Sequence, residues 1–135
     1  MATERGIRAW SLGAVARDRL VQSTALIGVP FTIAQPTVAG TATYNIYQSN
    51  APRRFVVYRV YGYMTGAGAA ADTVVVDNGT NNITDTISVA LLSDTDAFDA
   101  AQINDANNVI QKGGSLRIVT ASGALCTVFM DCAWT

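Results

Sequence analysis

Residues 62–80, GYMTGAGAAADTVVVDNGT, decide between two classes of fold. Gly66, Gly68 and Ala71 match the G-x-G-x-x-G/A spacing of a loop that holds the pyrophosphate of a dinucleotide. Such a loop follows a β-strand and opens into a helix, whose free N–H groups bind the phosphates. Without that helix, the same glycines form a bend between two strands.

The residues after the glycines favour a second strand. Residues 73–76 are a β-branched run, and β-branched side chains prefer strands because their χ1 angle is restricted. Asp77-Asn78-Gly79 then supplies residues that accept positive φ, as in a tight hairpin turn. No room is left for a crossover helix. We therefore interpret Gly66 and Gly68 as a bend and predict that they bind no nucleotide.

Short strands are also predicted on both sides of this bend. Residues 100–110 fit either a short helix or two brief strands around Asn107-Asn108. Turn residues such as Gly113-Gly114 separate the other segments, and helical periods are nearly absent. The pattern predicts an all-β fold, an antiparallel β-sandwich or jelly roll that spans residues 39–135. The strands are expected at residues 41–47, 55–64, 73–77, 83–91, 115–120 and 125–134.

Residues 1–38 differ from the rest of the chain. They show no sustained helical or strand period, and Pro30 and Pro36 favour extended backbone at the residues before them. Their apolar content is too high for a solvated tail, which predicts an extended, largely irregular arm that lies on a partner. The predicted partner contacts of the arm are Arg5, Arg8, Trp10, Leu12, Arg17, Arg19, Leu20 and Phe31.

Charge divides the 135-residue chain into unlike halves, although the formal net charge is only −1. Residues 1–60 hold seven arginines against Glu4 and Asp18, and residues 61–135 hold eight aspartates against Lys112 and Arg117. Such a split suggests either a nucleic-acid arm or complementary docking between copies of the chain. Charged residues make up only 14% of the chain, which suits a protein that covers part of its surface with partners.

Arg53 and Arg54 are the predicted partner contacts of the body. Together with Arg59 and three nearby tyrosines, they also fit a stacking platform for nucleic acid. Arginine is preferred over lysine where planar pairing with carboxylates is needed, and the second half of the chain supplies aspartates. We therefore expect a protein partner, and we expect neither nucleic acid nor a small-molecule substrate.

The residues that usually carry enzymatic chemistry are scarce. The chain has no histidine, which removes the commonest general base and the commonest transition-metal ligand. In an EF-hand register beginning at Asp94, Phe98 would take the fifth position and Asp99 would replace the required glycine. A looser calcium site in residues 93–99 stays open. We predict no enzymatic activity, no cofactor and no catalytic or metal site.

Two further expectations concern the cell compartment and the cysteines. The first residues show no apolar signal region, and no run is long enough to span a membrane, so we expect synthesis in a cytoplasm. Cys126 and Cys132 lie six residues apart on one predicted strand, about 20 Å at the usual rise. We therefore expect two free, buried thiols, with Cys126, Val128, Met130, Cys132 and Trp134 on one face of the strand.

Three stretches together resemble small structural proteins of tailed bacteriophages. They are TGAGAAADTVVVDNGTNNITDTISVAL (65–91), INDANNVIQKGGSLRIVTASGA (103–124) and CTVFMDCAWT (126–135). The resemblance covers about residues 55–135 and is strongest to head decoration, or cement, proteins with a jelly-roll body and an extended arm. It rests on turns and strands rather than on catalytic residues.

The resemblance implies a homotrimer on the exterior of the capsid, made in the host cytoplasm, whose arm reaches neighbouring copies of the major capsid protein. An alternative from another class is a β-sandwich of the phage tail or baseplate that binds a host glycan or another tail protein. A glycan site would favour exposed aromatic side chains on loops, whereas most aromatic residues here fall within predicted strands or the arm.

Overall fold

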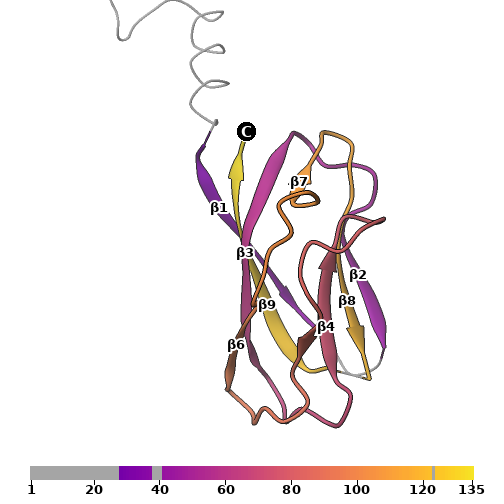
Figure 1. Ribbon diagram of the computed structural model, residues 1–135, viewed down its shortest axis with the longest axis vertical. Coiled ribbons are helices and arrows are strands. Elements are labelled where there is room, and N and C mark those ends of the chain that lie inside the picture. Colours follow the sequence, from indigo (N-terminus) through magenta and orange to yellow (C-terminus); the bar gives the residue numbers. More distant parts are fainter. Residues whose placement is uncertain (1–27, 38–40, 123) are drawn as a thin grey trace, which may run out of the picture.

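The protein is a sandwich of two antiparallel β-sheets (Figure 1). The computed structural model describes residues 28–37, 41–122 and 124–135, and within these ranges it contains nine strands and no helix. One sheet has the order β1-β9-β3-β6, with β7 also paired to β3, and the other has the order β2-β8-β4-β5. The strands are β1 (Pro30–Pro36), β2 (Ala42–Tyr47), β3 (Phe55–Met64), β4 (Thr73–Asp77), β5 (Ile87–Ser88), β6 (Ala97–Asp99), β7 (Val109–Ile110), β8 (Leu116–Ala121) and β9 (Cys126–Trp134).

The strand pairs are nested in the sequence. The first strand pairs with the last, β1 with β9, and the next pairs inward are β2 with β8, β3 with β6 and β4 with β5. A long antiparallel ribbon of this kind, wrapped so that its strands fall into two sheets, is a jelly roll. The expected all-β sandwich is therefore confirmed, together with its jelly-roll topology.

The core lies between the sheets and follows the alternation of the strands. Along β9, every second residue from Cys126 to Cys132 is fully buried, and β8 contributes Leu116 and Ile118 in the same way. The alternation arises because successive side chains in a strand point to opposite faces. The largest fully buried side chains are Phe55, Met64, Ile83, Ile110, Leu116, Ile118, Met130, Val57, Val60, Val74 and Val76.

The predicted boundary near residue 39 needs correction, because β1 belongs to the sandwich. Residues 30–36 pair with β9 along their whole length, from Pro30 opposite Ala133 to Pro36 opposite Thr127. Phe31, expected to contact a partner, instead stacks on Trp134 with ring centroids 4.2 Å apart and meets Phe55 edge-on at 5.5 Å. The two prolines concealed this strand, because proline cannot donate to a ladder and is confined to strand ends and edges.

Two other segments differ from expectation. Residues 83–91, predicted as one strand, form only the short strand β5 with turns on both sides. Residues 100–110 contain an isolated bridge at Ile103 and the strand β7, and no helix. Asn108 explains β7: its backbone and side chain both hydrogen-bond to Val57 at 2.9 Å, where the register of β3 shifts.

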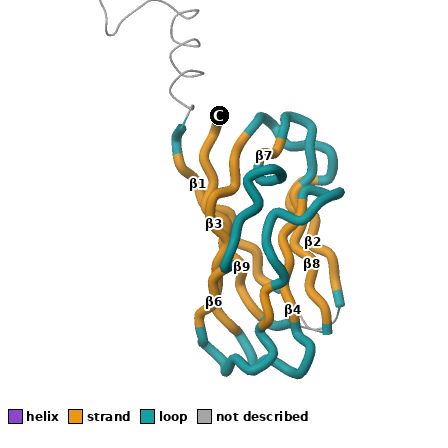
Figure 2. The backbone as a smooth tube through the Cα atoms, viewed as in Figure 1, coloured by secondary structure: helices purple, strands orange, loops and turns teal. Residues whose placement is uncertain are grey.

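The glycines of residues 62–80 form a bend between β3 and β4, as predicted. The chain leaves the sheet of β3 after Met64 and enters the sheet of β4 at Thr73, so the segment crosses between the two layers (Figure 2). Gly68 packs directly on the backbone at residues 89–92, where its N–H donates to Leu92 O at 2.8 Å. A Cβ at Gly68 would collide with the carbonyl oxygen of Val89. The close approach of the Val89 backbone therefore explains why residue 68 is glycine, and a phosphate-binding loop would not explain it.

Substitution at the two glycines should give unequal results. Gly68→Ala should lower the free energy of unfolding by roughly 1–3 kcal/mol, because the new methyl group meets fixed backbone. Gly66→Ala is the matched control: its Cβ would meet the flexible end of Leu125 at 2.8 Å, so the loss should stay within about 0.5 kcal/mol. Urea unfolding followed by circular dichroism measures both. In equilibrium dialysis, a micromolar nucleotide affinity that Gly68→Val abolishes would contradict this account of the bend.

Both cysteines are free and fully buried on the inner face of β9. Burial raises the pKa of the Cys132 thiol to about 12, with the nearby charge of Asp131 acting in the same direction. Burial also raises the pKa of the Cys126 thiol, against a hydrogen bond with Thr37 that lowers it. Because the thiolate is the reactive form, both groups should be inert in the folded protein.

Thiol labelling should therefore report global unfolding. We expect an aromatic disulfide reagent or a maleimide to leave both cysteines unmodified at neutral pH and to label both in concentrated urea. Intact mass under non-reducing conditions should show two free thiols. Rapid labelling of the native protein, or an internal disulfide, would show that Cys126 and Cys132 do not face the core from β9 as described.

Candidate functional site

The outer face of the β1-β9-β3-β6 sheet carries a row of polar contacts that crosses all four strands. Asp131 on β9 accepts hydrogen bonds from Thr32 on β1 at 2.9 Å and from the Tyr61 hydroxyl on β3 at 3.1 Å. Arg59 on β3 then pairs with Asp99 on β6 at 2.9 Å. Since both partners of that ion pair are about half exposed, the pair orders the surface and contributes little to stability.

Aromatic rings stand beside this polar row. Tyr61 and Phe129 are opposite one another on β3 and β9, and their rings stack with centroids 5.4 Å apart. Tyr63 extends the group, 5.8 Å from Phe129. Tyr58 and Tyr63 are 50% and 42% exposed, which is unusual for aromatic residues in a sheet. We call the outward side chains of these four strands the outer face.

Two neighbouring side chains pack on the ring of Tyr61. Phe129 stacks on it from β9, and the Arg59 guanidinium, which reaches toward β6, lies 4.1 Å from its centroid. β9 and β6 flank β3 on opposite sides, and Asp99 on β6 holds Arg59 by an ion pair. Burial, followed by the hydrogen bond to Asp131, raises the pKa of the Tyr61 hydroxyl. Bases and sugars bind to open ring faces, so this arrangement suits side-on packing against a protein better than stacking.

A second candidate surface lies where the described chain enters the sandwich. Gly28 N–H hydrogen-bonds to Trp134 O, so the chain enters beside its own C-terminal residues (Figure 1). The loop before β3 lies at the same end: Arg53 is 5.9 Å from the Trp134 ring centroid, and Arg54 O accepts from Thr135 N. We call this the entry end. Within the described residues, neither arginine has an acidic partner.

The predicted site residues thus fall into three groups. Arg53 and Arg54 lie together at the entry end, and Phe31 is nearby but turned inward onto Trp134. Arg59, Tyr58 and Tyr63 lie on the outer face and do not join Arg53 and Arg54 in one platform. The other predicted arm contacts, Arg5, Arg8, Trp10, Leu12, Arg17, Arg19 and Leu20, lie outside the described residues.

Acidic side chains do not assemble a metal site in the described part of the chain. In the loop that was left open for calcium, Asp96 accepts a hydrogen bond from Ser93 N at 2.8 Å, and Asp99 is held by Arg59. Two open hollows are each lined in part by amide side chains. One, of about 340 Å³, adjoins Asn78 and Gln111, and the other, of about 400 Å³, adjoins Asp85 and Asp105.

Sequence reasoning missed Asp131 and Asp99 as organisers of the outer face. Asp131 is the one charged residue in an otherwise uncharged strand, flanked by Met130 and Cys132, and that isolation was the available signal. Its contacts come from Thr32 and Tyr61, which are 99 and 70 residues away in sequence. Such pairing becomes visible only when the strand register is known.

Comparison with known proteins adds no relative: no family model, curated protein sequence or solved structure matches this chain. In the part of the chain that the structure describes, no helix is long and apolar enough to span a membrane. The functional argument therefore depends on the two surfaces themselves.

On the outer face, Tyr61 should contribute to the stability of the fold and Tyr58 should contribute little. Tyr61→Ala should lower the free energy of unfolding by roughly 1–3 kcal/mol, because it removes a ring that packs on Phe129 and Arg59 and a hydrogen bond to Asp131. Tyr58→Ala, at a half-exposed position on the same strand, should change it by less than about 0.5 kcal/mol. Urea unfolding measures both, and equal losses would show that the ring stack is absent in solution.

Proposed function

We propose that this protein is a non-enzymatic structural protein of a bacteriophage virion. It binds the exterior of the capsid as a decoration protein and stabilises the lattice of the major capsid protein. The observation that carries the proposal is the position of the chain's entry point beside Arg53 and Arg54. Residues 1–27 and this basic pair then act on the same partner surface from one end of the body.

The distribution of charge supports a defined orientation. At the opposite end from Arg53 and Arg54, the loop between β5 and β6 exposes Asp94 and Asp96. A partner with an acidic surface would attract the entry end and repel the far end. Complementary charge of this kind mainly raises the association rate and fixes the orientation. Arg5, Arg8, Arg17 and Arg19 add positive charge before the entry point.

Residues 1–27 provide the apolar part of the attachment. Their large apolar side chains are Ile7, Trp10, Leu12, Leu20, Leu26 and Ile27. Burying half of them against a partner would contribute several kcal/mol at roughly 25 cal/mol per Å², before ordering is counted. A contact spread over several capsid subunits by such a segment suits a protein that must resist pressure from packaged DNA.

A homotrimer belongs to the same proposal, because the resemblance to decoration proteins implies it. The outer face is suited to contacts between copies: it exposes Tyr58 and Tyr63, and its charges are already paired or hydrogen-bonded within the sheet. Aromatic residues are enriched in protein interfaces, where unpaired charges are depleted.

The second candidate is a tail or baseplate module that binds a host glycan. The hollow adjoining Asp85 and Asp105 favours it, because amide and carboxylate groups hydrogen-bond to sugar hydroxyls. Against it, all aromatic residues in the described ranges lie in strands, and the loops around the hollows offer no ring for a sugar to stack on.

Localisation on the particle separates the two candidates. Antibodies raised against the recombinant protein should label the whole head surface of particles produced by the strain that encodes the chain, when viewed by electron microscopy. Label confined to the tail would favour the glycan-binding module. Particles that carry no label anywhere would contradict both.

Two truncations test the roles of the arm and of β1. A chain beginning at Gly28 should keep a cooperative unfolding transition but should no longer co-sediment with heads, because the attachment segment is gone and β1 is intact. A chain beginning at residue 39 should fail to fold, because it lacks the strand that pairs with β9. If the chain beginning at Gly28 decorates heads as tightly as the full chain, residues 1–27 are not the anchor.

A further inference from the structure

The turn after β4 contains the only Asn-Gly pair in the sequence, Asn78-Gly79. This dipeptide is prone to deamidation because glycine has no side chain to shield its backbone nitrogen. That nitrogen attacks Cγ of the asparagine side chain, a new N–Cγ bond forms, and ammonia leaves with the proton that the nitrogen gave up. Water then opens the cyclic imide to aspartate or to isoaspartate, which lengthens the backbone. The turn is at the surface, with Gly79 exposed, so water has access to it.

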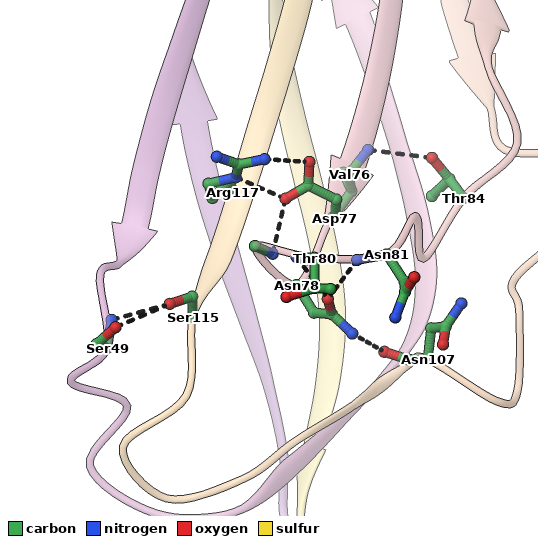
Figure 3. A network of polar contacts seen from close by, with 11 residues as sticks. Ser49, Val76, Asp77, Asn78, Thr80, Asn81, Thr84, Asn107, Ser115 and Arg117 are labelled. Carbon is green, nitrogen blue, oxygen red and sulfur yellow. Dashed lines mark hydrogen bonds and ion pairs between the residues drawn. The ribbon is translucent and has the colours of Figure 1, made fainter.

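Both reacting groups are engaged in hydrogen bonds within the turn (Figure 3). Gly79 N–H donates to Asp77 Oδ1 at 2.9 Å. The Asn78 side chain is fixed at both ends: its Oδ1 accepts from Thr80 N and Asn81 N at 3.0 and 2.8 Å, and its Nδ2 donates to Asn107 O at 3.3 Å. The glycine nitrogen must lose its proton before it attacks. A carboxylate that accepts this N–H opposes that loss, because a negative charge would form next to one already present.

Asp77 is itself held in place from the neighbouring strand. Arg117 on β8 lies opposite Asp77 on β4 and binds both carboxylate oxygens, Nε to Oδ1 at 2.7 Å and Nη2 to Oδ2 at 2.8 Å. The Asp77 side chain is only 9% exposed, so its orientation is set by these partners. A two-point contact between a guanidinium and a carboxylate fixes direction as well as distance.

Asp77 is a weak base in this setting. Burial alone would raise the pKa of its carboxyl group, but the hydrogen bonds from Arg117 and from the backbone of Gly79, together with the charge of Arg117, hold the pKa below its ordinary value of 3.8. A carboxylate that binds protons so poorly does not remove one from an amide. The contact with Gly79 therefore restrains the nitrogen and does not activate it.

We propose that Asn78 is a latent modification site and that the Asp77–Arg117 pair, acting through the Gly79 N–H, protects it from deamidation. We call the Asp77–Arg117 pair the lock. While Arg117 orients Asp77, the Gly79 nitrogen stays hydrogen-bonded and the Asn78 amide stays fixed. When the lock opens, cyclisation can proceed, and hydrolysis of the neutral imide then places a new negative charge next to Asp77. The isoaspartate product also displaces the contact with Asn107, which joins the loop after β4 to the loop before β7.

The experiment compares deamidation rates in the full-length protein. Wild type is incubated at mildly alkaline pH, folded and in urea, and the peptide that contains residue 78 is followed by mass and by enzymatic methylation of isoaspartate. Folded wild type should deamidate at Asn78 many-fold more slowly than the chain in urea. Equal rates in the two states would overturn the proposal.

Two variants then test the lock itself. Arg117→Gln removes the charge and the two-point contact, and Arg117→Lys keeps the charge but cannot bind both oxygens in the same way. Both should deamidate faster at Asn78 than wild type, with Gln above Lys. The matched control is Arg59→Gln, which breaks the Arg59–Asp99 pair on the other sheet and should leave the rate unchanged.

Thiol labelling in the same samples separates opening of the lock from unfolding, because Cys126 and Cys132 are buried in the core. Faster deamidation with unlabelled thiols supports the lock. A folded Arg117 variant that deamidates at the wild-type rate overturns it, as does an equal acceleration in Arg59→Gln. If Arg117→Gln unfolds and labels, the comparison of Arg117→Lys with wild type decides.

Discussion

The pairing of β1 with β9 is the constraint on which the rest of the structure depends. β9 lies between β1 and β3, and it is the strand through which the N-terminal and C-terminal parts of the described chain meet. Its inner residues Val128, Met130 and Cys132 are covered across the ladder by Gln35, Ile33 and Phe31. Without β1, β9 would become an open edge, and its buried side chains would lose their neighbours on one side. An exposed apolar edge of this length favours aggregation.

The two faces of β9 also differ in what they hold together. Its inner face carries small and flexible core residues that fill space, whereas its outer face carries Phe129 and Asp131, which organise side chains from the two adjacent strands. Because the two sets alternate along one strand, a change of surface chemistry need not disturb the core. The outward residues can then vary while the fold is kept.

The sequence predicted the class of fold because its signals were local. The β-branched run at residues 73–76, the turn at Asp77-Asn78-Gly79 and the alternation at residues 126–134 each depend on neighbours within a few residues. The predicted boundary of the arm was wrong because the signal for that segment is not local. Residues 30–36 carry a proline at each end and become a strand only because β9, about a hundred residues later, is available to pair with them. The single strand predicted at residues 83–91 was wrong because ladder pairing there is limited to Ile87 and Ser88, although Ile83 and Val89 are buried as well.

The functional surfaces were predictable only in part. Arg53 and Arg54 stood out as adjacent charges after a proline, and they do lie on an accessible end of the body. The outer face could not be found, because its polar row joins residues from four strands whose order in the sheet is not their order in the sequence. The arm contacts before residue 28 stay predictions.

The nested pairing has a consequence for how the chain is made. Nearly every ladder joins residues far apart in the sequence, and β9, an inner strand of one sheet, comes after all the other described strands in the chain. The sandwich cannot close before residues 126–134 have emerged from the ribosome. Until then β1 has no partner strand, and β3 lacks β9, the neighbour that pairs along its whole length. Folds dominated by distant pairing reach the native state slowly and are exposed to misassembly in the interval. The prolines at both ends of β1 have a further effect in this interval. Because proline has no backbone N–H, they shorten the part of unpaired β1 that could pair with a strand of a neighbouring nascent chain.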